Sequence, residues 1–193
     1  MSLSVLAEIS AADVAGAESV STGVLIIRVI VGVTFAAHGY YKFFKGGKIA
    51  GTARWFDSMR MRPNGTVHAY LAATTELVAG GLLALGFLTP LAGAAIVGQM
   101  LVAGYTANRE NGFWSASKGW EYNLILATVA VGVATIGPGK YSIDHQLELR
   151  QAFDPNIGLA VSLFLGLVSG VGVIVGCYRP PAPEPAPAAA DED

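Results

Sequence analysis

Three ionisable side chains, Arg28, His38 and Glu76, lie inside long apolar stretches of the sequence. An ionisable group within a membrane span is costly and usually faces the interior of a helix bundle, where it forms a pair, relays protons or contacts a ligand. We therefore take these three residues as the candidates for ligand binding or proton handling. No set of side chains has the spacing of a metal or nucleotide site, so we assign no metal ligand and no catalytic residue.

Arg28 has two interpretations. Its position in the first apolar stretch places it on one helical stripe with Gly32, Phe35, Gly39 and Lys42, which predicts that this face contacts other protein. Alternatively, the long side chain extends to the lipid headgroups at the nearer membrane surface.

Glu76 lies about ten residues into the second apolar stretch, a depth of roughly 15 Å at 1.5 Å per residue. A carboxyl group at that depth is protonated, paired, or beside a hydrated cavity. His38 lies beside the stripe that contains Arg28, which favours a structural, hydrogen-bonded histidine. A haem held between His38 and His68 is the remaining alternative, because we expect the third histidine, His145, at the opposite membrane surface.

The elements that must position these residues are membrane-spanning helices. The sequence is 53% hydrophobic and only 13% charged, and whole stretches are apolar on all sides. Each stretch is close to the ~20 residues needed to cross a bilayer, and the unpaired backbone of any other conformation is disfavoured in lipid. We predict an all-α membrane protein with spans over residues 22–44, 66–88, 91–107, 122–136 and 156–178.

The remaining segments are short. Residues 1–20 form an acidic N-terminal segment, and residues 179–193 form a tail rich in Pro, Ala and acidic residues that we expect to be disordered. Thr89 and Pro90 predict a tight turn, with Thr89 as the N-cap of the following helix. Residues 137–139, with the sequence Gly-Pro-Gly, predict a helix stop.

Basic residues predict the orientation in the membrane. They are concentrated in the first loop, the third loop and the tail, whereas the opposite surface carries only Lys140 and Arg150. The positive-inside rule then places the N-terminus outside and the C-terminus in the cytoplasm.

The net charge of −2 gives no basic surface for nucleic acid, and the single cysteine, Cys177, excludes an internal disulfide.

Two structural ion pairs are expected from this topology. Arg28 enters the membrane near the surface where the fourth span ends, so we expect it to pair with Asp144, with Glu76 as the second candidate partner. Lys42 and Glu121 both lie at the cytoplasmic ends of their spans on this topology and are expected to form the other pair. A solute site would lie between Arg28 and His38.

The pattern of these residues resembles the DoxX family of small bacterial membrane proteins. The resemblance covers about residues 24–146, which places a four-helix core at residues 21–146 and an additional connection and fifth helix at residues 147–178. It is carried by Arg28, Gly32, Phe35, His38, Gly39 and Lys42 in the first span, Glu76 in the second, Glu121 before the fourth, and the segment Gly-Pro-Gly-Lys-Tyr-Ser-Ile-Asp at 137–144.

The resemblance implies a bacterial plasma-membrane protein associated with quinone, thiosulfate or thiol-linked redox systems. We expect a non-catalytic accessory subunit of a membrane redox complex of the respiratory chain, with other membrane subunits and the lipid bilayer as partners. The alternative is a quinone-reactive oxidoreductase subunit of the thiosulfate:quinone or thiol-linked type. No intrinsic cofactor and no catalysis by this chain alone are expected, and a quinone or a lipid is the candidate bound molecule.

Overall fold

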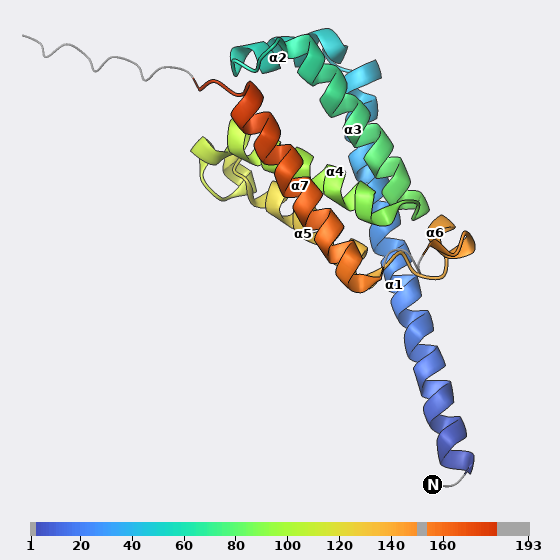
Figure 1. Ribbon diagram of the computed structural model, residues 1–193. Helices are drawn as coiled ribbons and strands as arrows, with labels where there is room; N and C mark the ends of the chain where they lie inside the picture. The colour runs from blue at the N-terminus through green and yellow to red at the C-terminus, as the bar shows by residue number, and fades with distance from the viewer. Residues whose placement is uncertain (1–2, 150–153, 181–193) are drawn as a thin grey trace, which may run out of the picture.

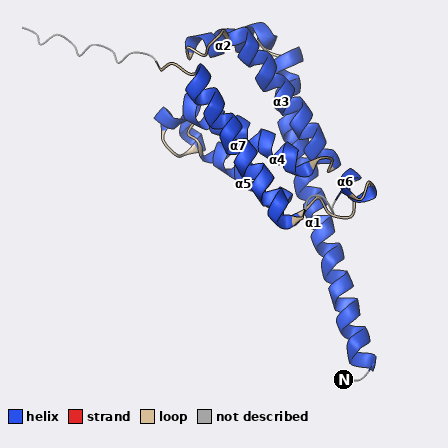
Figure 2. Ribbon diagram, in the orientation of Figure 1, coloured by secondary structure: helices blue, strands red, loops and turns tan. Residues whose placement is uncertain are grey.

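The computed structural model describes residues 3–149 and 154–180, with side chains described from residue 13 onward. The described residues form helices and connecting loops without a strand, apart from one isolated bridge (Figure 2). The main helices, coloured along the chain in Figure 1, are α1 (Leu3–Phe44), α2 (Lys48–Ser58), α3 (Gly65–Leu85), α4 (Thr89–Ala103), α5 (Glu121–Ile136), α6 (Ile143–Gln146) and α7 (Pro155–Cys177).

The expected membrane helices are present. Four helical segments, Asp13–Phe44, Gly65–Leu85, Thr89–Asn111 and Pro155–Cys177, are long and apolar enough to cross a membrane, and α5 is a shorter apolar helix. The third of these continues α4 through a π-helical turn, Gly104–Asn108, and a 3-10 turn, Arg109–Asn111. The prediction of an all-α membrane bundle is therefore confirmed.

The helices form two groups that meet along α3 and α4. In the first group α1 runs beside α3, and α2 lies across one end of them (Figure 1). In the second group α4 packs against both α5 and α7. Helix α7 follows the predicted four-helix core in sequence, yet it forms one of the most extensive helix contacts in the bundle.

Glycines allow α1 and α3 to approach closely. A Cβ atom added to Gly32 would lie 2.5 Å from the carbonyl oxygen of Gly80, and one added to Gly80 would lie 2.5 Å from the carbonyl oxygen of Gly32. Without a hydrophobic drive in lipid, helix association depends on such close backbone packing. The two glycines therefore fix the distance between α1 and α3 in the middle of the bundle.

Two local predictions need correction. The first loop contains helix α2, which buries Ala53 and Phe56 against the bundle although the segment is rich in basic residues. At the turn between α3 and α4, Leu88 rather than Thr89 is the N-cap, and it adopts a left-handed conformation with φ 49°. The helix stop at Gly137 is confirmed, because this residue is the C-cap of α5.

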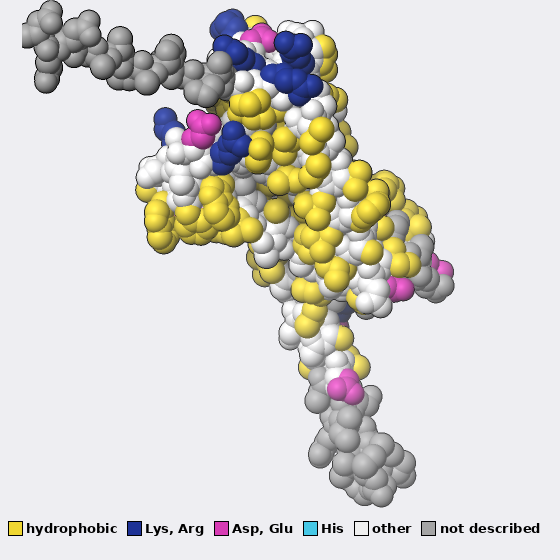
Figure 3. All heavy atoms as spheres, turned by 60° about the vertical axis from the view of Figure 1, so that its left-hand side comes forward, with side chains coloured by type: hydrophobic (Ala, Val, Ile, Leu, Met, Phe, Trp, Pro, Cys, Tyr) yellow, Lys and Arg dark blue, Asp and Glu magenta, His cyan; other side chains and the backbone are white. Residues whose placement is uncertain are grey.

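The two ends of the molecule differ in charge. Figure 3 shows Lys and Arg side chains gathered at the end that carries α2, above a broad hydrophobic band. Helix α1 extends beyond the bundle at the opposite end (Figure 1). Arg150, most of the predicted C-terminal tail and the first side chains of the acidic N-terminal segment lie outside the described residues.

Candidate functional site

A cavity of about 440 Å³ lies between the two helix groups at the basic end of the bundle. Helices α1, α2, α3, α4 and α7 all contribute to its wall, so it exists only because α7 packs beside α4. Its size is in the range of small-molecule pockets, which are mostly apolar with a few polar groups. The polar side chains in its lining are Lys42, His68, Thr75, Glu76, Gln99, Thr106 and Ser169.

The ammonium group of Lys42 donates a hydrogen bond to Oε2 of Glu76 at the wall of this cavity. The Lys42 side chain is 22% exposed and that of Glu76 is 7% exposed. Lys42 stands in the last turn of α1, where a cation is favoured by the helix dipole, and Glu76 stands on the buried face of α3. Of the three possibilities for Glu76, the structure shows a carboxylate that is both paired and beside a cavity.

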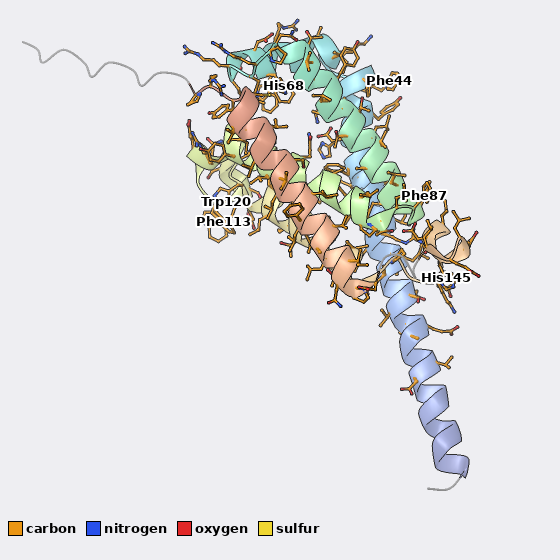
Figure 4. The ribbon with its side chains drawn as sticks, in the orientation of Figure 1. Phe44, His68, Phe87, Phe113, Trp120 and His145 are labelled. Atoms are coloured by element: carbon orange, nitrogen blue, oxygen red, sulfur yellow. The ribbon has the colours of Figure 1, made fainter. Side chains whose placement is uncertain are left out.

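His68 is buried near the same end of α3 and is labelled in Figure 4. Its Nε2 atom lies 2.6 Å from the carbonyl oxygen of Arg62. Because a carbonyl oxygen only accepts, Nε2 carries a proton and donates it to this oxygen. The Arg62 N–H in turn donates to the carbonyl oxygen of Cys177 at 2.8 Å, so this loop joins α3 to the end of α7.

The cavity opens to the side of the bundle rather than only toward its end. Leu71 on α3 and Trp55 on α2 line it and are 56% and 47% exposed, respectively, and Ser169 on α7 is also exposed. A molecule can therefore reach the polar lining from the region that lipid occupies. This geometry suits an amphiphile whose polar head is small and whose tail stays in the bilayer.

A different arrangement surrounds Arg28, at the other end of the bundle. The Arg28 side chain is 1% exposed and donates hydrogen bonds to the carbonyl oxygens of Ala84, Tyr141 and Pro138, the last from Nε at 3.2 Å. The guanidinium therefore binds backbone at the end of α3 and in the segment between α5 and α6. The interpretation in which Arg28 extends to lipid headgroups is wrong, since the side chain is enclosed by protein.

Asp144 is equally buried, at 1% exposed, but its partners are different. Its carboxylate accepts hydrogen bonds from the N–H of Leu88 at 2.7 Å, the N–H of Thr89 at 2.9 Å and the Thr89 hydroxyl at 2.7 Å. The Asp144 N–H also donates to the carbonyl oxygen of Gly86. Asp144 thus holds the left-handed Leu88 and the first turn of α4 in place.

Neither predicted ion pair is found among the salt bridges of the described residues. Arg28 and Asp144 close the same end of the bundle, as expected, but each binds backbone groups instead of the other. Lys42 pairs with Glu76, while the Glu121 carboxylate accepts a hydrogen bond from the Ser115 N–H at 2.9 Å. For Arg28, Asp144 and Glu121 the cause is that backbone donors and acceptors are invisible in a pattern of side-chain types. Lys42 instead pairs with a side chain on a different helix from the one predicted.

The predicted solute site between Arg28 and His38 does not coincide with the cavity at Lys42 and Glu76. The contact of Gly32 with Gly80 fills that part of the bundle, and the nearer cavity lies beyond it, at Lys42 and Glu76. His38 is exposed on the outer face of α1 and does not line the cavity, whereas the buried His68 does. A haem between these two histidines is not supported by their placement.

Two site residues were missed from the sequence. His68 was considered only as a haem ligand, and Gln99 was not considered at all. Gln99 offered a usable signal, because it is a polar side chain in the middle of the third apolar stretch. In the part of the chain that the structure describes, no group of three or more His, Cys, Asp or Glu side chains could hold a metal ion.

Comparison with known proteins supports a membrane protein of a defined type. A family model described as DoxX matches residues 23–109, which cover α1 to α4 and end before the segment 137–144. The "Uncharacterized membrane protein Rv3486" of Mycobacterium tuberculosis is 28% identical over 137 residues, covering 66% of this chain and 82% of that protein. The "Putative oxidoreductase CatD" of Bacillus subtilis is 28% identical over 127 residues, covering 66% of this chain and 88% of that protein. No solved structure matches the chain significantly.

Proposed function

From the match of residues 23–109 to the DoxX family model, we propose that the chain binds a quinone headgroup in the cavity beside Lys42 and Glu76. It would do so as a small subunit of a membrane redox complex. The observation that carries the proposal is a partly buried ion pair at the wall of a 440 Å³ cavity whose lining includes the exposed side chains of Leu71 and Trp55. The name of the Bacillus subtilis relative, which contains the word oxidoreductase, is consistent with it.

The chemistry of a quinone suits this lining. A quinone has two carbonyl oxygens that accept hydrogen bonds, and Lys42 and the Gln99 side-chain amide supply donors. Reduction to the quinol consumes two electrons and two protons, so the site must also deliver protons. Glu76 and His68 are the titratable groups that can exchange them with the basic end of the bundle.

The electrons would come from a redox-active partner subunit. This assignment keeps the expectation of an accessory subunit in a larger complex, because the chain contributes the binding site and proton-handling groups rather than the electron donor. It differs from a purely structural subunit in one respect: a purely structural subunit has no use for a charged, lipid-accessible cavity.

Fluorescence quenching of the purified full-length protein in detergent tests the proposal. A short-chain benzoquinone bound in the cavity lies beside Trp55, so saturable quenching is expected, and Trp55→Phe should remove most of it. Gln99→Leu removes a donor to a quinone carbonyl, and Glu76→Gln replaces the ion pair that holds the Lys42 ammonium at the cavity wall by a weaker hydrogen bond. Each change should weaken binding by about tenfold, which corresponds to about 1.4 kcal/mol.

His38→Gln is the matched control, because His38 lies on α1 but faces away from the cavity. Its quinone affinity should equal that of the unmodified protein. Quenching that does not saturate, or that is unchanged by both Glu76→Gln and Gln99→Leu, would exclude the cavity as a quinone site. Copurification of the chain with a cytochrome or flavoprotein subunit, but without quinone binding, would favour the purely structural role.

A further inference from the structure

A second hollow, of about 510 Å³, lies on another face of α4, between α5 and α7. Its lining is apolar along most of its length and carries Arg109, Tyr105 and Trp120 at one end. We propose that this groove binds an anionic phospholipid, with an acyl chain between α5 and α7 and the phosphate on Arg109. The site is separate from the quinone cavity and does not depend on it.

Among the described residues, the guanidinium of Arg109 at the headgroup end makes one loose ion pair and two contacts with aromatic rings. The Arg109 guanidinium lies over the ring of Tyr105, 4.2 Å from its centroid, and 5.8 Å from the centroid of the Tyr178 ring. Stacking on a ring face orients the guanidinium while leaving its N–H groups in the plane available for a phosphate. Its acidic neighbour, Glu110, is 3.8 Å away with a side chain that is 80% exposed, and so holds the guanidinium only loosely.

A π-helical turn in the backbone precedes Arg109 and positions the Tyr105 ring beneath its guanidinium. Tyr105 belongs to the π-helical turn Gly104–Asn108, directly before Arg109. Single π-helical turns interrupt a regular helix and frequently occur at functional sites. Here the turn lies where α4 reaches the basic end of the bundle, and Trp120 lies at the same level, as expected for the aromatic belt at a membrane surface.

The apolar part of the groove matches the depth of one leaflet. Trp120 directly precedes α5, and the α5 residues that line the groove run from Asn123 to Val131. The eleven helical steps from Trp120 to Val131 span roughly 16 Å at the rise of a helix, and half of a hydrocarbon core is about 15 Å. Leu163 and Leu167 of α7 form the other wall and are 38% and 47% exposed. A single acyl chain extending from a headgroup at Arg109 would therefore end near the middle of the bilayer.

Charge selects the class of lipid. Basic pockets between membrane helices on the positively charged side bind anionic headgroups. Arg109 lies beside Tyr178, which pairs with Met61 just after α2, and Figure 3 shows Lys and Arg side chains gathered at the end that carries α2. A zwitterionic lipid offers the same phosphate but adds a cation that the guanidinium repels. The groove should therefore prefer phosphatidylglycerol to phosphatidylcholine of the same acyl composition.

Native mass spectrometry of the full-length protein in a neutral detergent tests this preference. Delipidated protein is mixed with equal amounts of dioleoyl phosphatidylglycerol and dioleoyl phosphatidylcholine, and the retained lipid is counted. One phosphatidylglycerol per chain should be retained, with at least a fivefold preference. Arg109→Gln should remove the preference, and Ala127→Trp should block the groove and reduce retention of both lipids.

Arg54→Gln is the matched control, because Arg54 is an exposed arginine on α2 that does not line the groove. It should keep the full preference for phosphatidylglycerol. Equal retention of the two lipids by the unmodified protein, or equal losses with Arg54→Gln and Arg109→Gln, would overturn the proposal. Arg109→Gln should leave the quenching by benzoquinone unchanged, so failure of this inference is distinguishable from failure of the quinone proposal.

Discussion

The two ends of the bundle both bury charged side chains, but they satisfy them in different ways. At the end beside α6, Arg28 and Asp144 are each 1% exposed and bind backbone groups, and the surrounding chain leaves them no access to solvent. At the basic end, Lys42 and Glu76 bind each other and border a cavity. In the first case the charges hold turns together, and in the second they remain available.

This difference separates two roles that look alike in a sequence. A buried charge whose donors or acceptors are all used by backbone can be removed only at the expense of stability. A charge pair that faces a cavity can exchange one partner for a ligand, because water or the ligand compensates for the change. The distinction predicts opposite outcomes for stability and for binding at the two ends.

The largest expected effect on stability is that of Arg28→Met. The change leaves the carbonyl oxygens of Ala84, Pro138 and Tyr141 without their donor, and each buried unsatisfied group costs about 1 kcal/mol or more. We expect a loss of about 3 kcal/mol, measured by thermal unfolding in detergent, with quinone affinity unchanged in the folded fraction. Arg54→Met, at an exposed position, should have almost no effect. Equal stability of the two variants would show that Arg28 does not hold the α5–α6 segment.

A smaller loss is expected for Gly80→Ala, which tests the packing between the two ends. The new Cβ would lie 2.5 Å from the carbonyl oxygen of Gly32, so α1 and α3 must separate, at a cost of about 1–3 kcal/mol. Gly81→Ala is the matched control, because nothing lies within 4 Å of its added Cβ. That variant should be neutral or more stable by up to about 1 kcal/mol, as alanine favours a helix. The comparison needs only the thermal midpoints of the two variants.

Glu76→Gln should affect stability less than either of these changes. The glutamine can still accept a hydrogen bond from Lys42, whose side chain is 22% exposed and can reach water in the cavity. We expect a loss of about 1 kcal/mol or less in the free energy of unfolding, together with the loss of quinone affinity described above. A destabilisation as large as that of Arg28→Met would mean that the pair is structural and that the two ends do not differ.

The smallest effect is expected at Lys140, outside the bundle core. Its ammonium binds the Glu18 carboxylate, and this hydrogen bond raises the pKa of Lys140 above its ordinary value. As long as the Glu18 carboxylate is ionised, the contribution of Lys140 is therefore fully present below about pH 10.4, the ordinary pKa of lysine, and is lost as the pH rises through the raised pKa. Lys140→Gln should lower the thermal midpoint slightly, and sodium chloride at 0.5 M should abolish the difference. A difference that persists in salt would point to packing rather than charge.

The sequence predicted the helices well and their polar contacts poorly. Long apolar runs are sufficient to locate the spans, and the glycine at 137 ends α5 as expected. Helix α2 was missed because its amphipathic pattern is short and is surrounded by basic residues. The positions of Arg28 and Asp144 at one end of the bundle were also correctly inferred from span directions.

What failed was the choice of partners. The predicted partner of Arg28 was a carboxylate, whereas its actual partners are carbonyl oxygens, which every residue has and no pattern distinguishes. Lys42 was assigned to Glu121 because both lie at one surface, but the Lys42 ammonium donates a hydrogen bond to Glu76 on α3 instead. Such choices depend on helix rotation, which apolar runs with little amphipathic character do not specify.

Helix α7 also determines when the cavity comes into being. The segment that lines it, from Ser169 to Val173, is among the last parts of the described chain to be synthesised, long after Lys42 and Glu76. Because chains fold progressively from the N-terminus during synthesis, the two helices that carry the ion pair insert before the site has its final wall. A nascent chain that ends after α5 therefore holds the charges of the site without an enclosed space, and the proposed ligand site is complete only once α7 has been synthesised.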